Sequence, residues 1–237
     1  MKQIASLAAL LIPLTFMTTN AAEPETASIS PDHFQQVIFE DDFSADRLSK
    51  RWGMYKSASV IRDGVMVGIT PEDAGHPSVN TIRIEPQADL EVSVRFKFAG
   101  SKNFQVMYRD RTCKSSHAGH ICHVAVSPKF LTMYDGKTGI FRKDIREMRK
   151  AKKKLDDSIV QLLKTKSSRH KIDLDQSSWH QLVIRIQGDA METFVDGKFI
   201  GRFQSEGLAH STKDQVNLTT GQREMLYDDF QIKGVSR

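Results

Sequence analysis

Five hydrogen-bonding side chains fall on the polar side of segments in which apolar and polar residues alternate. Arg and Gln present forked N–H donors that suit the oxygens of hydroxyl and carboxylate groups, and His can donate, accept or titrate near neutral pH. No Asp or Glu has a clear place in this set, which therefore suits the binding of a polar or anionic ligand better than hydrolysis by carboxylates. Alternatively, each residue is an ordinary solvent-facing strand residue. The set is Arg95, Gln105, Arg109, His123 and Arg185.

The alternation of apolar and polar residues, with a period of two, predicts on which face of the strands this set lies. In Glu91–Phe98 and Asn103–Arg109 every second residue is apolar, as in antiparallel strands that have one face in the core and one in solvent. Asp-Gly pairs, which favour tight hairpins, occur at Asp63-Gly64, Asp135-Gly136 and Asp196-Gly197. Short strands joined by such turns predict an all-β sandwich or barrel. The residues predicted to face the core are Val92, Val94, Phe96, Phe98, Phe104, Val106 and Tyr108.

One segment, residues 143–166, breaks the alternation. It contains no Gly or Pro, and its apolar residues recur at helical spacing, so we predict one or two helices inserted between strands. Residues 142–171 hold twelve Lys or Arg against four Asp or Glu, a balance of +8, whereas the whole chain has a net charge of +5. The basic patch is centred on Lys150, Lys152, Lys153 and Lys154.

The basic segment has two interpretations. It is either a solvated helix face that covers a sheet edge or a surface for an acidic partner, of which an acidic glycan is preferred. Nucleic acid is not expected, because no aromatic residues are interleaved with the charges to stack on bases. Docking of a structural cell-surface protein through the basic helix is a further alternative.

The first residues predict the compartment. Lys2 precedes an apolar run, and small residues follow, as in a cleaved secretory signal. We therefore expect a signal peptide over residues 1–22, a flexible leader over 23–33 and a single β-sandwich domain over 34–237. The protein is then secreted, to the periplasm or the extracellular space if it is bacterial. No membrane span is expected, because no later segment has enough consecutive apolar residues.

The two cysteines, Cys113 and Cys122, are nine residues apart. In a secreted chain thiols oxidise, so a disulfide across a hairpin is predicted. The alternative is a metal cluster with the nearby His117, His120 and His123, which is less favoured because the CxxC spacing is missing.

Four segments resemble the concanavalin A-like lectin/glucanase superfamily, whose laminin-G-like jelly roll has two antiparallel sheets. Phe39–Gly64 resembles its opening strands, Trp179–Gly201 its Asp-Gly hairpin and Tyr227–Val235 its closing strand. The strand Asn103–Arg109 (NFQVMYR) is similar to the central strand of the 3-keto-disaccharide hydrolase domain family. The resemblance implies a jelly-roll sandwich with the helical insert at about 143–166, and it implies fold rather than function.

In this superfamily the open face of one sheet binds glycans. If the five polar residues line that face, we expect them to bind a polysaccharide or oligosaccharide, and an acidic one is among the candidates. Laminarinase-type retaining enzymes carry E-x-D-x-x-E, because their chemistry needs two carboxylates about 5–5.5 Å apart, and this chain lacks that motif. The alternative enzyme is a glycoside hydrolase or lyase that acts on an oxidised (3-keto) or acidic sugar through His123 or a hydrated metal.

The resemblance also implies one structural calcium ion away from the open face. Asp229 of YDDFQI matches the calcium-binding Asp of laminarinase-type sandwiches, and Gly64 and Glu40 would supply carbonyl oxygens. Calcium accepts six to eight oxygen ligands in loose geometry. Alternatively, Asp229 is a solvent-side residue of an edge strand.

Overall fold

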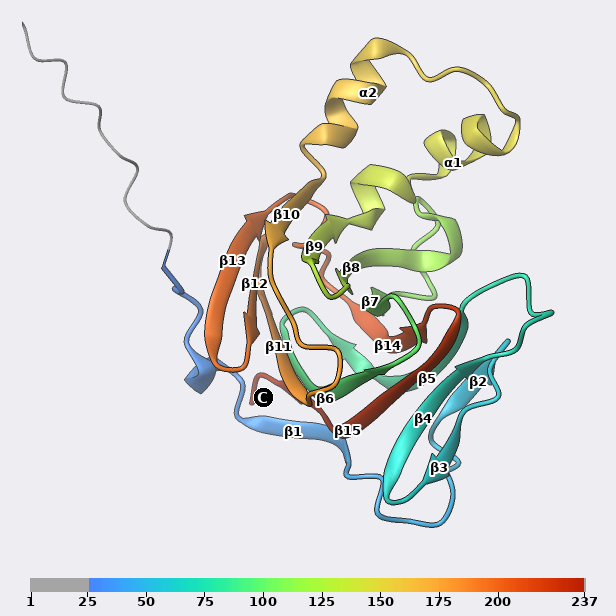
Figure 1. Ribbon diagram of the computed structural model, residues 1–237. Helices are drawn as coiled ribbons and strands as arrows, with labels where there is room; N and C mark the ends of the chain where they lie inside the picture. The colour runs from blue at the N-terminus through green and yellow to red at the C-terminus, as the bar shows by residue number, and fades with distance from the viewer. Residues whose placement is uncertain (1–25, 237) are drawn as a thin grey trace, which may run out of the picture.

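Residues 26–236 are described by the computed structural model, and they pair into two antiparallel sheets that face each other (Figure 1). The predicted signal peptide, residues 1–22, lies outside the described residues. Within the described part, no helix is long and apolar enough to cross a membrane.

The first sheet has the strand order β13-β12-β11-β6-β15-β4-β3, and β1 also pairs with β15. The long strand β15 pairs with β6 along one edge, and along the other it pairs first with β4 and then with β1. Its strands are β1 (Gln36–Asp41), β3 (Val60–Arg62), β4 (Val65–Thr70), β6 (Leu90–Ala99), β11 (His180–Gln187), β12 (Ala190–Val195), β13 (Lys198–Gln204) and β15 (Arg223–Gly234).

The second sheet has the order β10-β9-β8-β7-β14-β5-β2. Strand β14, near the end of the chain, pairs between β7 and β5, so residues from distant parts of the sequence lie side by side in this sheet. Its strands are β2 (Gly53–Tyr55), β5 (Ser78–Gln87), β7 (Phe104–Arg109), β8 (His120–Val126), β9 (Phe130–Asp135), β10 (Ser167–Lys171) and β14 (Lys213–Thr220).

The core lies between the sheets and contains the apolar residues predicted from the alternation. The seven predicted residues of β6 and β7 are all at most 5% exposed. Burial of so much apolar surface is the main stabilising contribution to such a fold. The prediction of an all-β, two-sheet jelly-roll sandwich is confirmed.

Two of the three Asp-Gly pairs form the predicted hairpins. Asp63 and Gly64 join β3 to β4, Asp196 and Gly197 join β12 to β13, and all four residues have positive φ, as tight turns of this kind require. The prediction for Asp135-Gly136 is wrong. The buried Asp135 carboxylate accepts hydrogen bonds from the Thr138 amide and from Ser205, so the chain continues into a helical turn, η3 (Gly136–Ile140).

The insert follows η3 and connects β9 to β10. It contains α1 (Lys143–Lys150) and α2 (Asp157–Lys164), which extend beyond the end of the sandwich (Figure 1). Ile145 is fully buried, which anchors α1. Helices within residues 143–166 were predicted, and the structure confirms them.

Part of the segment expected to be a flexible leader is packed against the first sheet. Ser28 and Ile29 donate backbone hydrogen bonds to the buried Glu192 carboxylate, and Ile29 is buried with Phe34 and Ala190. A short helical turn, η1 (Pro31–His33), follows. The sequence did not predict this contact, because the segment has few apolar residues and is held mainly by hydrogen bonds to a carboxylate that is distant in the sequence.

Candidate functional site

A groove of about 1070 Å³ runs over the solvent-facing side of the second sheet. Alternate residues of three adjacent strands form its floor, because a period of two places them on the same face. These are Val79, Thr81 and Arg83 of β5, Gln105, Met107 and Arg109 of β7, and Gln215, Asn217 and Thr219 of β14.

Segments at opposite ends of the sheet form the two walls. One wall comes from the β7–β8 connection and the base of the insert, with His117, Ala118, His120, Phe141 and Arg146. The other comes from β2, the residues just before it and the loop before β5, with Lys50, Arg51, Gly53, Met54, Tyr55, His76 and Pro77. Tyr55 is 59% exposed, and its ring contacts the edge of the His76 ring at a centroid distance of 5.5 Å.

The groove carries an uncompensated positive charge. No Asp or Glu is among its lining residues within the described chain, whereas Lys50, Arg51, Arg83, Arg109 and Arg146 are. None of these five forms an ion pair with a carboxylate of residues 26–236. The described lining therefore offers hydrogen-bond donors and positive charge, and it contains no pair of carboxylates of the kind that most glycosidases use.

Two buried amides on the floor lack partners. Gln215 and Asn217 are 5% and 1% exposed, and their side-chain carbonyl oxygens accept no hydrogen bond from any described residue. Most buried polar atoms in proteins are hydrogen-bonded, but these two oxygens are shielded from solvent as well as unpaired, so a ligand in the groove could reach them only after the two amides turn. Sequence reasoning missed both, although the alternation Gln215, Asn217, Thr219 was available as a signal.

Arg109 lies where the groove floor meets the basic wall. Its Nε donates a hydrogen bond of 2.8 Å to the Ala118 carbonyl, and one terminal nitrogen donates to the same oxygen. Burial lowers the pKa of its guanidinium. Among the described residues Nη1 has no partner, so the guanidinium is fixed in position while donors remain for a ligand.

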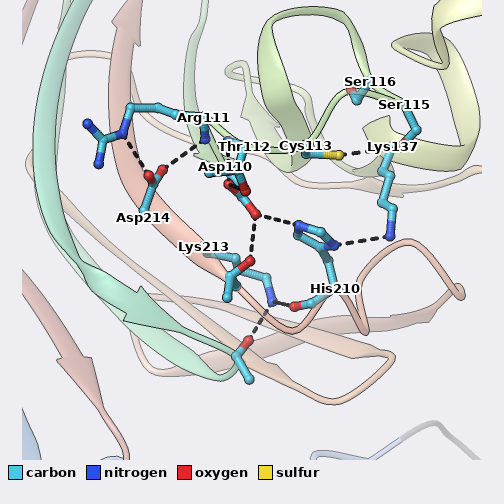
Figure 2. A network of polar contacts seen from close by, with 12 residues as sticks. Asp110, Arg111, Thr112, Cys113, Ser115, Ser116, Lys137, His210, Lys213 and Asp214 are labelled. Atoms are coloured by element: carbon cyan, nitrogen blue, oxygen red, sulfur yellow. Dashed lines mark hydrogen bonds and ion pairs between the residues drawn. The ribbon is translucent and has the colours of Figure 1, made fainter.

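A polar network behind this wall fixes its shape (Figure 2). Asp110 accepts hydrogen bonds from Thr112, from Thr212 and from His210 Nε2 at 2.8 Å. Burial by itself raises the pKa of Asp110, but these bonds outweigh it and hold the pKa well below its usual range.

The same network reaches the insert. Lys137 Nζ lies 3.1 Å from His210 Nδ1, and because an ammonium group can only donate, Nδ1 accepts and Nε2–H is directed to Asp110. The fully buried Lys213 donates to the carbonyls of His210 and Ala88 (Figure 2). The network therefore ties together the β7–β8 connection, the base of the insert and the start of β14.

His123 is on the predicted side of its strand but does not line the groove. Its ring stacks on Tyr134 at a centroid distance of 4.4 Å, Phe141 lies 5.7 Å away, and the residue is only 4% exposed. Burial lowers the pKa of His123 to about 3, so it is neutral at pH 7. The base of the insert covers this half of the sheet, which the alternation could not reveal.

Arg95 and Arg185 were predicted to share the glycan-binding face with Gln105 and Arg109, and that grouping is wrong. Both arginines lie on the first sheet, in β6 and β11. Arg95 pairs with Asp228 and Asp229 and lies over the Trp179 ring. Arg185 pairs with Glu91 at 2.7 Å and lies over the Phe194 ring. A period of two predicts which side of a strand a residue occupies, but it does not predict the sheet to which the strand belongs.

The predicted disulfide between Cys113 and Cys122 is absent, and both are free thiols. Cys122 points from β8 into the core, where burial raises the pKa of its thiol to about 12. Cys113 lies in the β7–β8 connection, 3.4 Å from the Ser115 hydroxyl. The nine-residue spacing suited a hairpin, but a helical turn, η2 (His117–Gly119), and a loop separate the two residues.

The predicted calcium ligands lie partly together. Glu40 and Asp229 line one acidic cleft with Asp41 and Asp42, whereas Gly64 is not among its lining residues. A bulge in β15 gives Asp229 a positive φ and places its carboxylate 3.2 Å from Arg95. Residues 26–236 contain no group of three or more His, Cys, Asp or Glu arranged for a metal. Calcium binding here stays a prediction.

Comparison with known proteins places the chain among carbohydrate-active folds. Residues 36–233 match the family of 3-keto-alpha-glucoside-1,2-lyase-like domains. No curated protein matches the sequence.

Solved structures share the fold at low sequence identity. SCLam, a non-specific endo-β-1,3(4)-glucanase from family GH16, is 10% identical, with a TM-score of 0.59 over 90% of this chain and 95% of that one. The carbohydrate-binding module CBM66 from Bacillus subtilis is 9% identical, with a TM-score of 0.51 over 78% and 96%. A sialidase is 10% identical, with a TM-score of 0.59 over 84% of this chain, which spans only 18% of the sialidase.

Proposed function

We propose that this chain, which belongs to the 3-keto-alpha-glucoside-1,2-lyase-like domain family, binds an oligosaccharide in the groove of the second sheet. The observation that carries the proposal is the floor of the groove, where the side chains of Gln105, Arg109, Gln215 and Asn217 lie on one face of the sheet and no described lining residue is an Asp or Glu. Sugar hydroxyls both donate and accept hydrogen bonds, so they match a surface of amides and guanidinium groups.

The far wall supplies an apolar contact. The exposed ring of Tyr55 has an apolar face and a polar hydroxyl, which suits the C–H face of a sugar ring. Binding sites of this kind combine apolar or aromatic surface with a few well-placed polar groups. A saccharide that spans the groove would stack on Tyr55 at one end and reach Arg109 at the other.

A glycan array screened at low and at moderate salt tests the proposal, followed by titration calorimetry with the tightest glycan. We expect Gln105→Ala and Tyr55→Ala each to weaken binding about tenfold, roughly 1.4 kcal/mol. Gln187→Ala, an exposed glutamine on β11 of the other sheet, is the matched control and should bind like wild type. The proposal fails if no glycan binds, or if the control loses as much affinity as Gln105→Ala.

A second candidate is elimination from a 3-keto glycoside, which the family match favours. A base removes the C2 proton next to the C3 ketone, the electron pair forms the C1–C2 double bond, and the aglycone leaves C1 and takes up a proton. His123 is too buried for this role, but the exposed His117 lines the groove. Burial and the nearby Arg146, Arg109 and Lys150 lower the pKa of His117, which keeps it neutral and able to accept a proton.

Incubation with a 3-keto glucoside distinguishes the candidates. Elimination should produce the ultraviolet absorbance of a conjugated ketone, and His117→Gln should abolish the signal while glycan affinity is retained. No absorbance with bound ligand would leave binding as the function.

We further propose secretion and one structural calcium ion. Secretion is supported by the signal-like pattern of residues 1–22, and N-terminal sequencing of protein exported by a bacterial host would test it. Calcium is supported by the oxygen-rich cleft that contains Glu40 and Asp229.

A further inference from the structure

A second cavity opens beside the basic wall of the groove. It has a volume of about 590 Å³ and lies between the β7–β8 connection and α1. It shares Arg109, His117, Ala118 and Arg146 with the groove, so the two spaces adjoin. Its other lining residues are Arg111, Cys113, Lys114, Ser116, Gly119, Lys143, Glu147 and Lys150.

The lining of this cavity is strongly cationic. It contains six Lys or Arg residues and one acid, Glu147. Of the six, only Arg111 is paired with a carboxylate among residues 26–236, that of Asp214 at 2.7 Å. Like charges that line one cavity with a single acid among them give it a positive potential, which attracts anions.

The fold, and not chance contact, brings these charges together. Arg109 comes from β7, Lys114 from the connection that follows it, and Arg146 from a helix of the insert. Gly119 shapes the connection, because it has a positive φ and a Cβ at this position would lie 2.0 Å from the Asp110 carbonyl oxygen. The Asp110–His210–Lys137 network holds the same connection against the base of the insert (Figure 2).

The positive potential of the cavity also affects the imidazole of His117. The pKa of His117 is lowered first by burial and then by repulsion from Arg146, Arg109 and Lys150. Three cations from two separate elements therefore act on one imidazole at the mouth of the cavity.

We propose that this cavity binds an anionic substituent, a sulfate ester or a carboxylate, of the saccharide that occupies the groove. The inference rests on the proposed saccharide binding and adds the chemical class of the ligand. Arg109 and Arg146 suit such a group because a guanidinium can donate two parallel hydrogen bonds to two oxygens. The cavity accommodates one substituent or sugar unit, so recognition is local and does not require the whole basic surface of the insert.

The structure offers a matched control for total charge. Lys152, Lys153 and Lys154 are exposed in the connection between α1 and α2 and line neither cavity nor groove, whereas Arg146 lines both. Replacing Arg146 or Lys153 by Gln removes the same charge, but only Arg146→Gln removes it from the site. Both positions are solvent-accessible, so neither variant should disturb folding.

The experiment is calorimetry with a sulfated oligosaccharide, its chemically desulfated counterpart and a uronate-containing counterpart, at low and at physiological salt. Wild type should bind the sulfated or uronate form at least about tenfold more tightly than the neutral form. Arg146→Gln should reduce this preference, the ratio of the anionic to the neutral affinity, severalfold, and Lys153→Gln should behave like wild type. The two anionic arms decide between sulfate and carboxylate.

Three outcomes overturn the inference. Equal binding of charged and neutral forms by wild type refutes the anion site and leaves the groove as a saccharide site. An equal loss of preference in Arg146→Gln and Lys153→Gln assigns the effect to diffuse surface charge. Binding of none of the three oligosaccharides refutes the saccharide function together with the inference.

Discussion

Replacement of His123 by Phe should make the protein less sensitive to acid. In the folded protein burial lowers the pKa of His123 to about 3, whereas its usual value is 6.5. The unfolded chain therefore binds a proton between these pH values that the folded protein cannot accept. Stability is fully present above pH 6.5 and is lost as the pH falls from 6.5 toward 3.

The size of this loss of stability follows from the difference in proton binding between the unfolded and the folded protein. At pH 5 an unfolded histidine is 1.5 units below its usual pKa, and each unit corresponds to about 1.36 kcal/mol. Wild type should therefore lose about 2 kcal/mol between pH 7 and pH 5 through His123 alone. Phe keeps an aromatic ring on Tyr134, cannot be protonated and removes the buried Nδ1, which has no partner among the described residues.

Urea unfolding at pH 7 and pH 5, followed by tryptophan fluorescence, measures the effect. The stability lost between the two pH values should be about 2 kcal/mol smaller in His123→Phe than in wild type. Because only the pH dependence is compared, a packing change that is equal at both pH values does not matter. An equal loss in both proteins would refute the assignment of His123 as a buried neutral group.

His180 provides a control of opposite sign. Burial lowers its pKa, but hydrogen bonds to Asp196 at 2.7 Å and to the Asp175 carbonyl outweigh this and raise the pKa above its usual value. Its contribution is present below pH 6.5 and is lost as the pH rises through the folded value. His180→Gln should therefore destabilise the protein more at pH 5 than at pH 7.

Three further predictions concern other sites. Asp110→Ala should lower the free energy of unfolding by about 3 kcal/mol in urea, because it removes a buried carboxylate that accepts hydrogen bonds from Thr112, Thr212 and His210, and an unchanged midpoint would show that the network in Figure 2 is not stabilising. In the native protein a thiol reagent should label Cys113, which is partly exposed, and should reach Cys122 only after unfolding; a joined peptide in a non-reducing map would contradict this. Millimolar calcium should raise the melting temperature relative to EDTA in wild type but not in Asp229→Asn, and identical curves in all four conditions would exclude the ion.

Much of the fold could be predicted because strand alternation is a local property. The inward residues of β6 and β7 followed from a period of two, and the change to helical spacing located the insert. The basic character of the insert and the lack of the E-x-D-x-x-E motif could also be seen directly in the sequence. Each of these features depends on residues within a few positions of one another, so no knowledge of distant contacts was needed.

The candidate site could be predicted only in part. Gln105 and Arg109 lie together in the groove, but Arg95 and Arg185 lie on the other sheet. Tyr55, Gln215 and Asn217 were missed, because their place beside β7 depends on how β2, β5 and β14 pair.

The sequence by itself therefore determined the strands with clear alternation, the side of those strands that faces the core, the helical insert and the location of the excess positive charge. Only the tertiary structure decided which strands share a sheet, that Phe141 covers His123, and that Arg146 meets Arg109 beside the groove. The physical reason is that the side-chain period is set by the geometry of a single strand, whereas sheet membership is set by hydrogen bonding between strands far apart in the chain. In this protein, the pairing of strands that are far apart in the chain determines where a ligand can bind.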